Sequence, residues 1–272
     1  MAIRNYNIQS AIGLIPAAGT GSRIAPLSGS KELYPIGFRS TTDGKLRPKV
    51  VCHYLLESMR LAGIRKAYVL LRDNKWDIPA YLGDGSLVDM NLGYLVVTAL
   101  FGVPYTIERA YEFVQDAVVT LGFPDIIFQP QDAFVRLLAH LSDSEADLVL
   151  GVVPFDQPSK GGMVDFDTNG CVSFVVDKPQ QSTLRYSWFT AAWTPSFTEF
   201  LHQYLVSQPF VPTKEVLIND VIQAAIDSGL KVEVEVFENG NFLDIGTPED
   251  LVRAVRNGVM VADKITTLDA NS

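Results

Sequence analysis

The stretch AIGLIPAAGTGSRIAPLSGSKELYPI, residues 11 to 36, decides the fold of this chain. It begins with the apolar run of residues 11 to 18, which is typical of a short strand buried on both faces of a parallel sheet. Gly19 and Gly21 follow at once, and glycines at such a place permit positive φ and a close approach of backbone N–H groups to phosphate oxygens. The pattern therefore predicts a first strand that leads into an anion-binding loop.

Two cations lie in the same loop. Arg23 and Lys31 supply fixed positive charge of the kind that a triphosphate needs, in a chain that is otherwise acidic. The loop is not a P-loop, because no Gly-Lys-Ser/Thr follows the second glycine, and it lacks the spacing of a dinucleotide fingerprint. A tight turn with a solvated arginine and lysine is the alternative that the motif by itself leaves open.

Strand-like and helix-like segments alternate along the rest of the chain. Strands are expected at residues 66 to 71, 92 to 98, 117 to 121, 148 to 153 and 232 to 237, and helices at 50 to 63, 106 to 113, 133 to 141, 196 to 206, 216 to 228 and 248 to 256. This alternation predicts an α/β fold with a doubly wound, mainly parallel sheet and helices on both of its faces. Residues 38 to 48 are polar and rich in turn formers, which predicts a surface excursion.

The sequence pattern changes from alternating strands and helices to that of a β-hairpin between residues 162 and 176, where Asn169-Gly170 predicts the turn. We expect this hairpin to leave the main sheet and to form a small subdomain over its edge, at about residues 160 to 210. No linker or repeat divides the remainder. The expected organisation is a single domain over residues 1 to 260 and a C-terminal tail over residues 261 to 272.

Charge and composition limit the partners of this chain. The 272 residues carry a net charge of -9, which disfavours a nucleic-acid surface or an anionic membrane as a partner. Two cysteines, Cys52 and Cys171, are too few for a disulfide framework or a zinc thiolate cluster. The N-terminus carries charge where a signal peptide has an apolar run, and no stretch reaches the roughly 18 apolar residues of a membrane span. We therefore expect a cytoplasmic location.

The loop after the first strand also has a specific likeness. Residues 14 to 36, LIPAAGTGSRIAPLSGSKELYPI, resemble the signature loop of the sugar nucleotidyltransferases, the family of glucose-1-phosphate thymidylyltransferases and related pyrophosphorylases. Further stretches are similar in the same order: Lys49 before a helix that ends in LAGI (61 to 64), YLGDGS (81 to 86), GGMVDFDTNG (161 to 170), DKP (177 to 179), ND (219 to 220) and FLDIGTPEDL (242 to 251). The resemblance covers residues 11 to about 255 and implies a Rossmann-like fold of nucleotidyltransferase type A.

The resemblance also implies roles for individual residues. It implies that the nucleotide is lined by a set of small residues: Ala18, Gly19, Thr20, Gly21 and Gly102. Arg23 and Lys31 would grip the β- and γ-phosphates, while Asp125 and Asp244 resemble the two aspartates that bind Mg²⁺. On the sugar side, Gly162 would offer its backbone, Asp177 would accept from hydroxyls, and Lys178 would contact the phosphate.

The chemistry implied by this family needs the same groups. The attack of one phosphate oxygen on the α-phosphorus of a triphosphate brings two polyanions together, so catalysis consists mainly of charge neutralisation and alignment. Two carboxylates that hold Mg²⁺, together with arginine and lysine, meet that need. For each aspartate a plainer reading exists, since Asp125 fits a turn after Pro124 and Asp244 fits the turn before the last predicted helix.

Three departures from the family pattern limit the transfer. The loop from Pro26 to Lys31 is about two residues shorter than in the thymidylyltransferases, and Phe123-Pro124 stands where leucine-glycine precedes the first metal aspartate. The glutamine that reads the base in those enzymes falls, in an ungapped comparison, on Val97. A valine offers no hydrogen bond to a base, so we expect weak discrimination among nucleoside triphosphates, and neither the base nor the sugar follows from the sequence.

The sequence thus predicts a nucleotidyltransferase that transfers a nucleoside monophosphate from a nucleoside triphosphate to a sugar 1-phosphate and releases pyrophosphate. One alternative is a cytidylyltransferase that acts on a non-sugar phosphate or phosphonate. A second is a catalytically silent regulator that binds nucleotide or sugar phosphate, although such a protein has no need to keep both metal carboxylates. The expected partners are the two substrates and, where the chain self-associates, copies of itself in a homo-oligomer.

Overall fold

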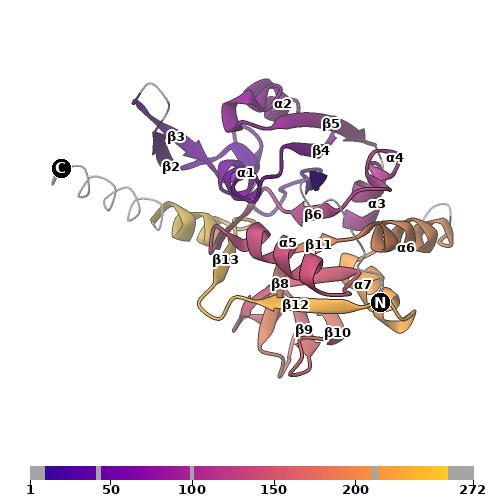
Figure 1. Cartoon of the computed structure of the whole chain (residues 1–272). Coiled ribbons are helices and arrows are strands. Elements are labelled where there is room, and N and C mark those ends of the chain that lie inside the picture. Colours follow the sequence, from indigo (N-terminus) through magenta and orange to yellow (C-terminus); the bar gives the residue numbers. More distant parts are fainter. Residues whose placement is uncertain (1–9, 41–43, 99–100, 210–213, 257–272) are drawn as a thin grey trace.

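The computed structural model describes residues 10–40, 44–98, 101–209 and 214–256. A nine-stranded sheet forms its centre, and helices cover both faces of that sheet (Figure 1). The strands of this sheet are β1 (Ile12–Pro16), β4 (Lys66–Arg72), β5 (Asn91–Val97), β6 (Val119–Gly122), β8 (Leu148–Pro154), β9 (Gly162–Phe166), β10 (Val172–Asp177), β11 (Tyr186–Trp193) and β12 (Val232–Val236). The α-helices are α1 (Val51–Leu61), α2 (Asp77–Leu82), α3 (Val103–Glu108), α4 (Tyr111–Val114), α5 (Ala133–Asp143), α6 (Pro195–Val206) and α7 (Ile218–Asp227), and residues 248–256 are also helical.

The strands of the central sheet run mainly in one direction, as predicted. β1 pairs in parallel with β4 and β6, β4 pairs in parallel with β5, and β8 pairs in parallel with β12. β11 is antiparallel to β6, β8 and β9, and β10 is antiparallel to β9. Of the strands described in this sheet, β10 and β11 are therefore the two that run against the others.

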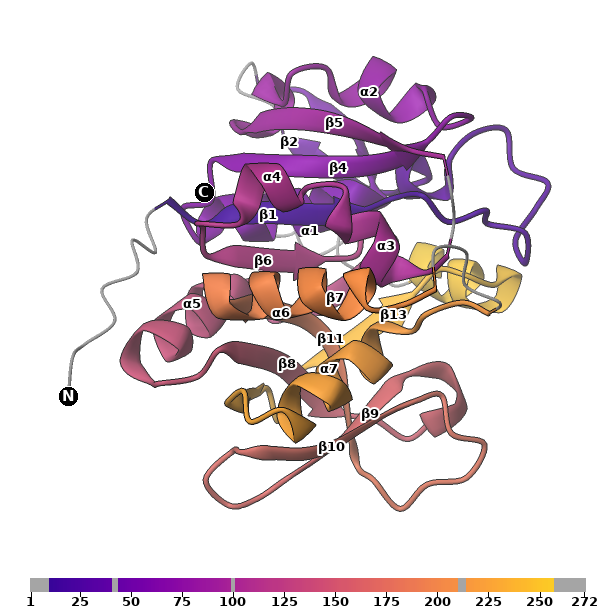
Figure 2. The ribbon, with the colours of Figure 1, turned by 90° about the vertical axis from the view of Figure 1, so that its right-hand side faces the viewer.

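Two apolar clusters, one on each face of the sheet, account for the doubly wound arrangement. Neighbouring residues of β1 point to opposite faces: Ile15 joins the cluster that contains α1, α2 and α5, and Leu14 joins the cluster that contains α3, α4, α6 and α7. The second group of helices lies in front of the sheet in Figure 2. A strand that is apolar on both faces therefore forms the middle of a three-layer α/β structure.

The hairpin turns at Asn169-Gly170 as expected, with φ +84° at Gly170, but it does not leave the main sheet. β9 pairs with β11, a strand that sequence analysis does not predict, and the hairpin thereby becomes one end of the central sheet. Along β11, Thr190 stands opposite Gly122 at the end of β6, whereas Trp188 stands opposite Gly162 at the start of β9. On this side β11 therefore pairs first with β9 and then with β6, and the change of partner lies beside the carboxyl end of β6.

Two antiparallel ribbons flank the central sheet. One consists of β7 (Ile126–Gln129) and β13 (Asn241–Asp244), and the other of β2 (Pro35–Ser40) and β3 (Leu46–Val50). The second ribbon occupies most of the segment predicted as a surface excursion. Ile36 of β2 and Ile245 after β13 are buried in one small cluster, so the ribbons and the last helix pack together.

The predicted helices agree with the structure apart from one. The segment from 106 to 113 forms two short helices, α3 and α4, because the chain turns between them at Arg109 and Ala110. Thr247 caps the last helix as expected, since its Oγ1 accepts from the backbone N–H of Asp250 at 3.2 Å. The predicted tail at 261 to 272 lies outside the described residues.

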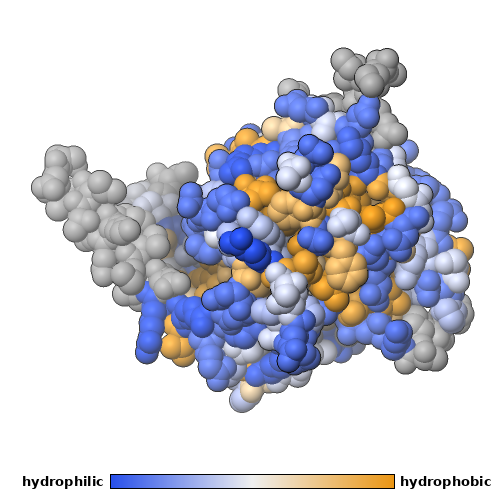
Figure 3. Space-filling model, turned by 90° about the horizontal axis from the view of Figure 1, so that it is seen from below, coloured by the Kyte–Doolittle hydropathy of each residue, from blue (hydrophilic) through white to orange (hydrophobic). Residues whose placement is uncertain are grey.

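The described helices include none that is long and apolar enough to cross a lipid bilayer. Seen from the end that carries β9 and β10, the surface shows apolar side chains across its middle and polar side chains around them (Figure 3). Short 3₁₀ helices lie at Lys31–Leu33, Ser86–Val88 and Pro158–Lys160.

Candidate active site

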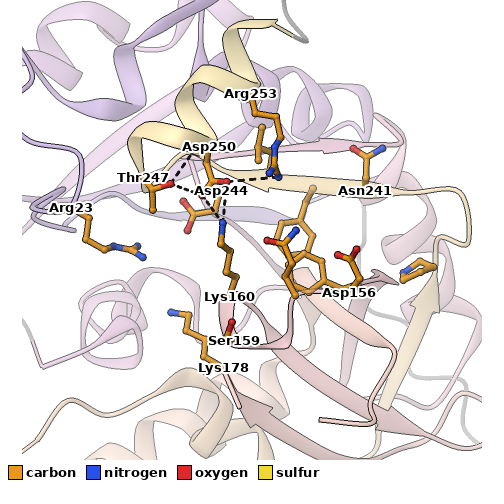
Figure 4. Close-up of a pocket in the computed structure, with 15 residues that line it drawn as sticks. Arg23, Asp156, Ser159, Lys160, Lys178, Asn241, Asp244, Thr247, Asp250 and Arg253 are labelled. Atoms are coloured by element: carbon orange, nitrogen blue, oxygen red, sulfur yellow. Dashed lines mark hydrogen bonds and ion pairs between the residues drawn. The ribbon is translucent and has the colours of Figure 1, made fainter. Parts of the chain in front are cut away.

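Three cavities lie beyond the carboxyl ends of β1 and β6, the edge where open parallel sheets bind ligands. The glycine-loop cavity, of about 500 Å³, is lined by the loop after β1 and by residues 102–106. The hairpin cavity, of about 210 Å³, lies where β11 exchanges β6 for β9. The ribbon cavity, of about 260 Å³, lies beside β13 and the last helix (Figure 4).

Six charged side chains each line more than one of these cavities, and two of them, Lys160 (hairpin and ribbon cavities) and Glu215 (glycine-loop and hairpin cavities), are not predicted from the sequence. Arg23 lines the glycine-loop and ribbon cavities, and Asp125 lines the glycine-loop and hairpin cavities. Lys178 and Asp244 line both the hairpin and the ribbon cavity. Neighbouring cavities therefore share three cations and three carboxylates that come from distant parts of the sequence.

The two aspartates come together because of the β7–β13 ribbon. Asp125 directly precedes β7, Asp244 ends β13, and the register pairs Asp244 with Ile126. The backbone N–H of Ile245 donates to the carbonyl oxygen of Asp125 at 3.1 Å, which fixes the two strand ends against each other. Lys31 forms an ion pair with Asp125.

Burial and the repulsion between two carboxylates both act on Asp244. Burial raises the pKa of Asp244, the neighbouring charge of Asp125 raises it further, and Lys31 and Arg23 oppose both effects only in part. Burial disfavours the charge of Lys31, but Asp125 and Asp244 outweigh it and raise the pKa of the lysine. A further cation would relieve the repulsion between the carboxylates.

Asp244 also has an oxygen suited to such a cation. Its Oδ1 is buried and has no hydrogen-bond partner in the part of the chain that the structure describes. Carboxylate oxygens are the ligands that Mg²⁺ prefers, so Asp125 and Asp244 fit a hard divalent ion. The described residues contain no group of three or more His, Cys, Asp and Glu side chains placed for a metal, so the other ligands of an ion would be water or substrate oxygens.

Arg23 approaches the same place over a glycine. A Cβ atom built on Gly246 would lie 2.8 Å from Nη2 of Arg23 and 3.0 Å from Oδ1 of Asp244. Any side chain at this position would therefore push the guanidinium or the carboxylate away. In Figure 4, Arg23 and Lys160 extend toward Asp244 from different elements.

The residues on both sides of Lys31 are fixed by side-chain contacts. Ser30 donates through its backbone N–H and its hydroxyl to the two carboxylate oxygens of Asp77, each at 2.7 Å. On the other side of the lysine, Glu32 forms a buried ion pair with Lys75 at 2.5 Å. Whatever the length of this loop in the thymidylyltransferases, Lys31 reaches Asp125 in this protein.

The hairpin cavity contains a chain of three hydrogen-bonded side chains. Trp188 donates from Nε1 to Oδ1 of Asn219 at 2.7 Å, and Asn219 donates from Nδ2 to Oδ1 of Asp177 at 3.0 Å. Gly162 stands opposite both Trp188 and Asp177 in the sheet. The structure thus brings two of the predicted sugar-side residues, Gly162 and Asp177, to one cavity.

Lys178 has an unusual backbone. Among described residues other than glycine, Lys178 and Asp89 are the two with positive φ, and the value at Lys178 is 43°. Its N–H donates to the carbonyl oxygen of Gly161 at 3.1 Å, which stabilises this conformation. Such backbone strain is common at ligand sites, because it aims a side chain that regular structure would turn elsewhere.

The residues predicted to line the nucleotide also gather at one cavity. Ala18, Gly19, Thr20, Gly21 and Gly102 all line the glycine-loop cavity. Gly102 has φ +111°, and a Cβ atom there would lie 2.0 Å from the carbonyl oxygen of Val216, so only glycine fits. Val97 behaves differently, because it is 3% exposed within the apolar core and is not among the residues that line any of the three cavities.

Several polar residues at the site have no role in the sequence analysis. Asn219 is part of the Asn219-Asp220 dipeptide that resembles the family, but the resemblance implies no role for it. Its side chain bonds to Trp188, which is 31 residues away, and no local sequence pattern connects the two. Lys75, Asp77 and Glu215 lie outside every motif that the sequence analysis uses. Lys160 beside the hairpin forms an ion pair with Asp250 at 3.3 Å, and only the three-dimensional structure reveals that contact.

The comparisons with known proteins show the family of this chain. Residues 12–258 match the family described as Nucleotidyl transferase, which is most of the chain. The chain belongs to the nucleotidyl transferase family. The family predicted from the resemblance of the signature loop is thereby confirmed.

Curated members of the nucleotidyl transferase family show where this chain is similar. It is 26% identical over 256 residues to a low-salt glycan biosynthesis nucleotidyltransferase of Haloferax volcanii, covering 93% of this chain and 66% of that protein. It is 26% identical over 247 residues to a glucose-1-phosphate thymidylyltransferase of Streptomyces griseus, covering 89% of this chain and 64% of that protein. The chain thus spans about two thirds of the length of these relatives.

Solved structures support the fold. UTP-bound UGPase from Acinetobacter baumannii superposes with a TM-score of 0.73 at 16% identity, covering 96% of this chain and 99% of that one. A UDP-glucose pyrophosphorylase complexed with UDP-glucose also gives a TM-score of 0.73 at 16% identity, covering 91% and 98%. At this identity the likeness establishes the architecture of the nucleotidyl transferase family and nothing finer.

Proposed function

We propose that this protein is a sugar-1-phosphate nucleotidyltransferase, which transfers a nucleoside monophosphate from a nucleoside triphosphate to a sugar 1-phosphate. The observation that carries the proposal is that adjoining cavities share charged side chains, among them Arg23, Asp125, Lys178 and Asp244, with Lys31 paired to Asp125. Two anionic substrates could approach these side chains from separate cavities and meet among fixed charges. The names of the curated relatives, a glycan biosynthesis nucleotidyltransferase and a glucose-1-phosphate thymidylyltransferase, support the same reading.

The reaction is a direct displacement at phosphorus. An oxygen of the sugar phosphate forms a bond to the α-phosphorus, the bond from that phosphorus to the bridging oxygen breaks, and the electron pair leaves with pyrophosphate. No protein nucleophile takes part. Arg23 and Lys31 stabilise the negative charge that develops on the leaving pyrophosphate, and Lys178 holds the attacking phosphate against its repulsion.

The carboxylates serve a different purpose. Asp125 and Asp244 would hold Mg²⁺, which supplies positive charge shared by the two substrates when it is bound. The orphaned Oδ1 of Asp244 and the mutual repulsion of the carboxylates support this assignment. In the free protein the ion pair with Lys31 partly neutralises Asp125.

Binding of the two substrates divides between the cavities. The backbone from Ala18 to Gly21 and Gly102 would line the nucleotide in the glycine-loop cavity. Gly162 and Asp177 would bind the sugar in the hairpin cavity, with Lys178 at the phosphate between them and the aspartates. Because Val97 lies in the core, it gives no ground for expecting weak base discrimination, and the base must be read by residues that line the cavity.

Pyrophosphate release with a panel of sugar 1-phosphates and nucleoside triphosphates tests the proposal. We expect a turnover that requires both substrates and a divalent cation. Turnover with a phosphonate or a phosphoalcohol but with no sugar phosphate would indicate the cytidylyltransferase alternative, and tight binding without turnover would indicate the regulator. Cell fractionation and light scattering would test the expected cytoplasmic location and self-association.

A further inference from the structure

We propose that Trp188 and Asn219 are positioning residues for the sugar 1-phosphate, acting through Asp177. The inference rests on the proposed function, since it assumes that Asp177 receives hydroxyls of the sugar. Its observation is the hydrogen-bond chain from the indole through the amide to the carboxylate, which crosses the wall of the hairpin cavity. Trp188 is 7% and Asn219 2% exposed, so bulk water does not compete for these bonds.

The direction of the chain follows from the chemistry of the three groups. An indole N–H can only donate, so it must face the oxygen of the Asn219 amide. The amide nitrogen then faces Asp177 and donates to its Oδ1. Without the indole N–H the buried amide oxygen loses its partner, and the amide is then held by its bond to Asp177 alone. Trp188 therefore fixes the amide, and the amide fixes the carboxylate.

The sheet provides the space for this chain. Trp188, Gly162 and Asp177 stand opposite one another on β11, β9 and β10. A Cβ atom on Gly162 would lie 2.4 Å from Nε1 of Trp188 and 2.8 Å from Nδ2 of Asn219. The glycine therefore has a second use beside the one predicted from the sequence, because only a residue without a side chain lets the indole and the amide meet behind it.

The chain contains a matched control. Trp193, on the same strand, donates from Nε1 to Oγ1 of Thr198 at 2.9 Å and is 2% exposed. This residue does not line the hairpin cavity. Trp188→Phe and Trp193→Phe each remove one buried indole hydrogen bond of similar length, so their structural costs should be similar, whereas only the first interrupts the path to Asp177.

Steady-state kinetics of the two variants test the inference. For Trp188→Phe we expect KM for the sugar 1-phosphate to rise about 10-fold, the equivalent of one hydrogen bond, while KM for the triphosphate stays within about 2-fold. Trp193→Phe should leave both constants near wild type. Equal changes in the two KM values of Trp188→Phe, or the same change in both variants, would overturn the positioning role.

A second measurement does not depend on activity or on the identity of the sugar. In ¹⁵N-labelled protein, Asp177→Asn should shift the indole N–H resonance of Trp188 and leave that of Trp193 in place, because the substitution changes the far end of the hydrogen-bond chain. Trp188→Phe and Trp193→Phe assign the two signals. An unmoved Trp188 signal would refute the chain even in an active enzyme, whereas a shifted signal in a protein without turnover would refute only the proposed function.

Discussion

The glycine-loop cavity and the hairpin cavity hold their polar side chains by different means. Ion pairs fix the first: Lys31 pairs with Asp125, and Glu32 pairs with Lys75 directly beside it. Neutral donors fix the second, where an indole and an amide orient Asp177. A triphosphate is recognised by charge, which is strong and tolerant of angle, whereas sugar hydroxyls are recognised by directional hydrogen bonds. The difference matches the two substrates proposed for them.

The two cavities also differ in how their residues lie along the sequence. The glycine loop brings its backbone groups and both cations from one continuous stretch, residues 18 to 31. The hairpin cavity collects Gly162, Asp177, Trp188 and Asn219 from three strands and a helix. Asp125 and Asp244 lie on neither the glycine loop nor the hairpin, because they lie at the paired ends of the β7–β13 ribbon.

The largest effect is expected at these two aspartates. Asp125→Asn and Asp244→Asn should each reduce turnover at least about 10²-fold, because each removes a carboxylate that would hold the metal ion. Thermal unfolding should change little, since neither carboxylate anchors the core. Measurement of kcat at saturating Mg²⁺ decides the matter, and retained turnover would remove that residue from the mechanism.

The next largest effects should separate the two cavities. Arg23→Ala should impair turnover and use of the triphosphate, while Lys178→Ala should impair use of the sugar 1-phosphate, each by roughly 10- to 100-fold in kcat/KM, on the scale of a charge-assisted hydrogen bond. Each variant serves as the control for the other. If both variants affected the two substrates equally, the division of labour between the cavities would not exist.

A smaller effect on catalysis, with a larger one on stability, is expected from the Glu32–Lys75 pair beside Lys31. Lys75→Met leaves the buried charge of Glu32 unpaired, which should cost about 3–5 kcal/mol of stability and raise KM for the triphosphate more than KM for the acceptor. Burial already raises the pKa of Glu32. The double variant Lys75→Met, Glu32→Met should recover much of the stability and little of the triphosphate affinity. Recovery of both would mean that the pair supports the fold alone.

The smallest effect concerns pH and lies outside both cavities. A hydrogen bond to Glu235 raises the pKa of His140 above 6.5, burial opposes the rise, and Glu233 assists it, while Arg136 and Lys231 pair with the same glutamates. A histidine with a raised pKa contributes stability below about pH 6.5 and loses it as the pH rises through the folded value. Thermal unfolding between pH 6 and 8 should therefore show a decline that His140→Gln flattens. If the melting temperature of the wild type depended on pH as little as that of the variant, His140 would make no such contribution to stability.

The sequence predicts the parts of the site that lie in continuous motifs. The first strand, the glycine loop, both aspartates and the glycine of the hairpin all stand where adjacent residues indicate them, and the structure brings them together. β11 escapes prediction because YSWFTAAW is buried on both faces and shows no periodicity. Its absence from the prediction explains why the hairpin was expected to leave the sheet.

The error at Val97 has a different physical cause. Successive residues of a strand point to opposite faces of the sheet. An alignment of two sequences that is wrong by one residue therefore assigns a side chain to the wrong face. Val97 ends β5 on the face that joins the core, among side chains such as Leu70 and Ile107. Asn219 could not be assigned for another reason, because its partner is distant in sequence and hydrogen bonds between side chains leave no periodic trace.

The position of β11 also bears on how the protein is made. This strand pairs with β6, β8 and β9, so the middle of the sheet cannot close until a ribosome has synthesised the chain past residue 193. Asp125 is synthesised well before that point, whereas β13 and Asp244 follow β11 and β12. Pairing between distant segments is slow and leaves apolar edges uncovered in the meantime. A nascent chain that stops short of β13 would have both cations of the glycine loop and no second carboxylate, so the proposed catalytic centre forms only after β13 has been synthesised.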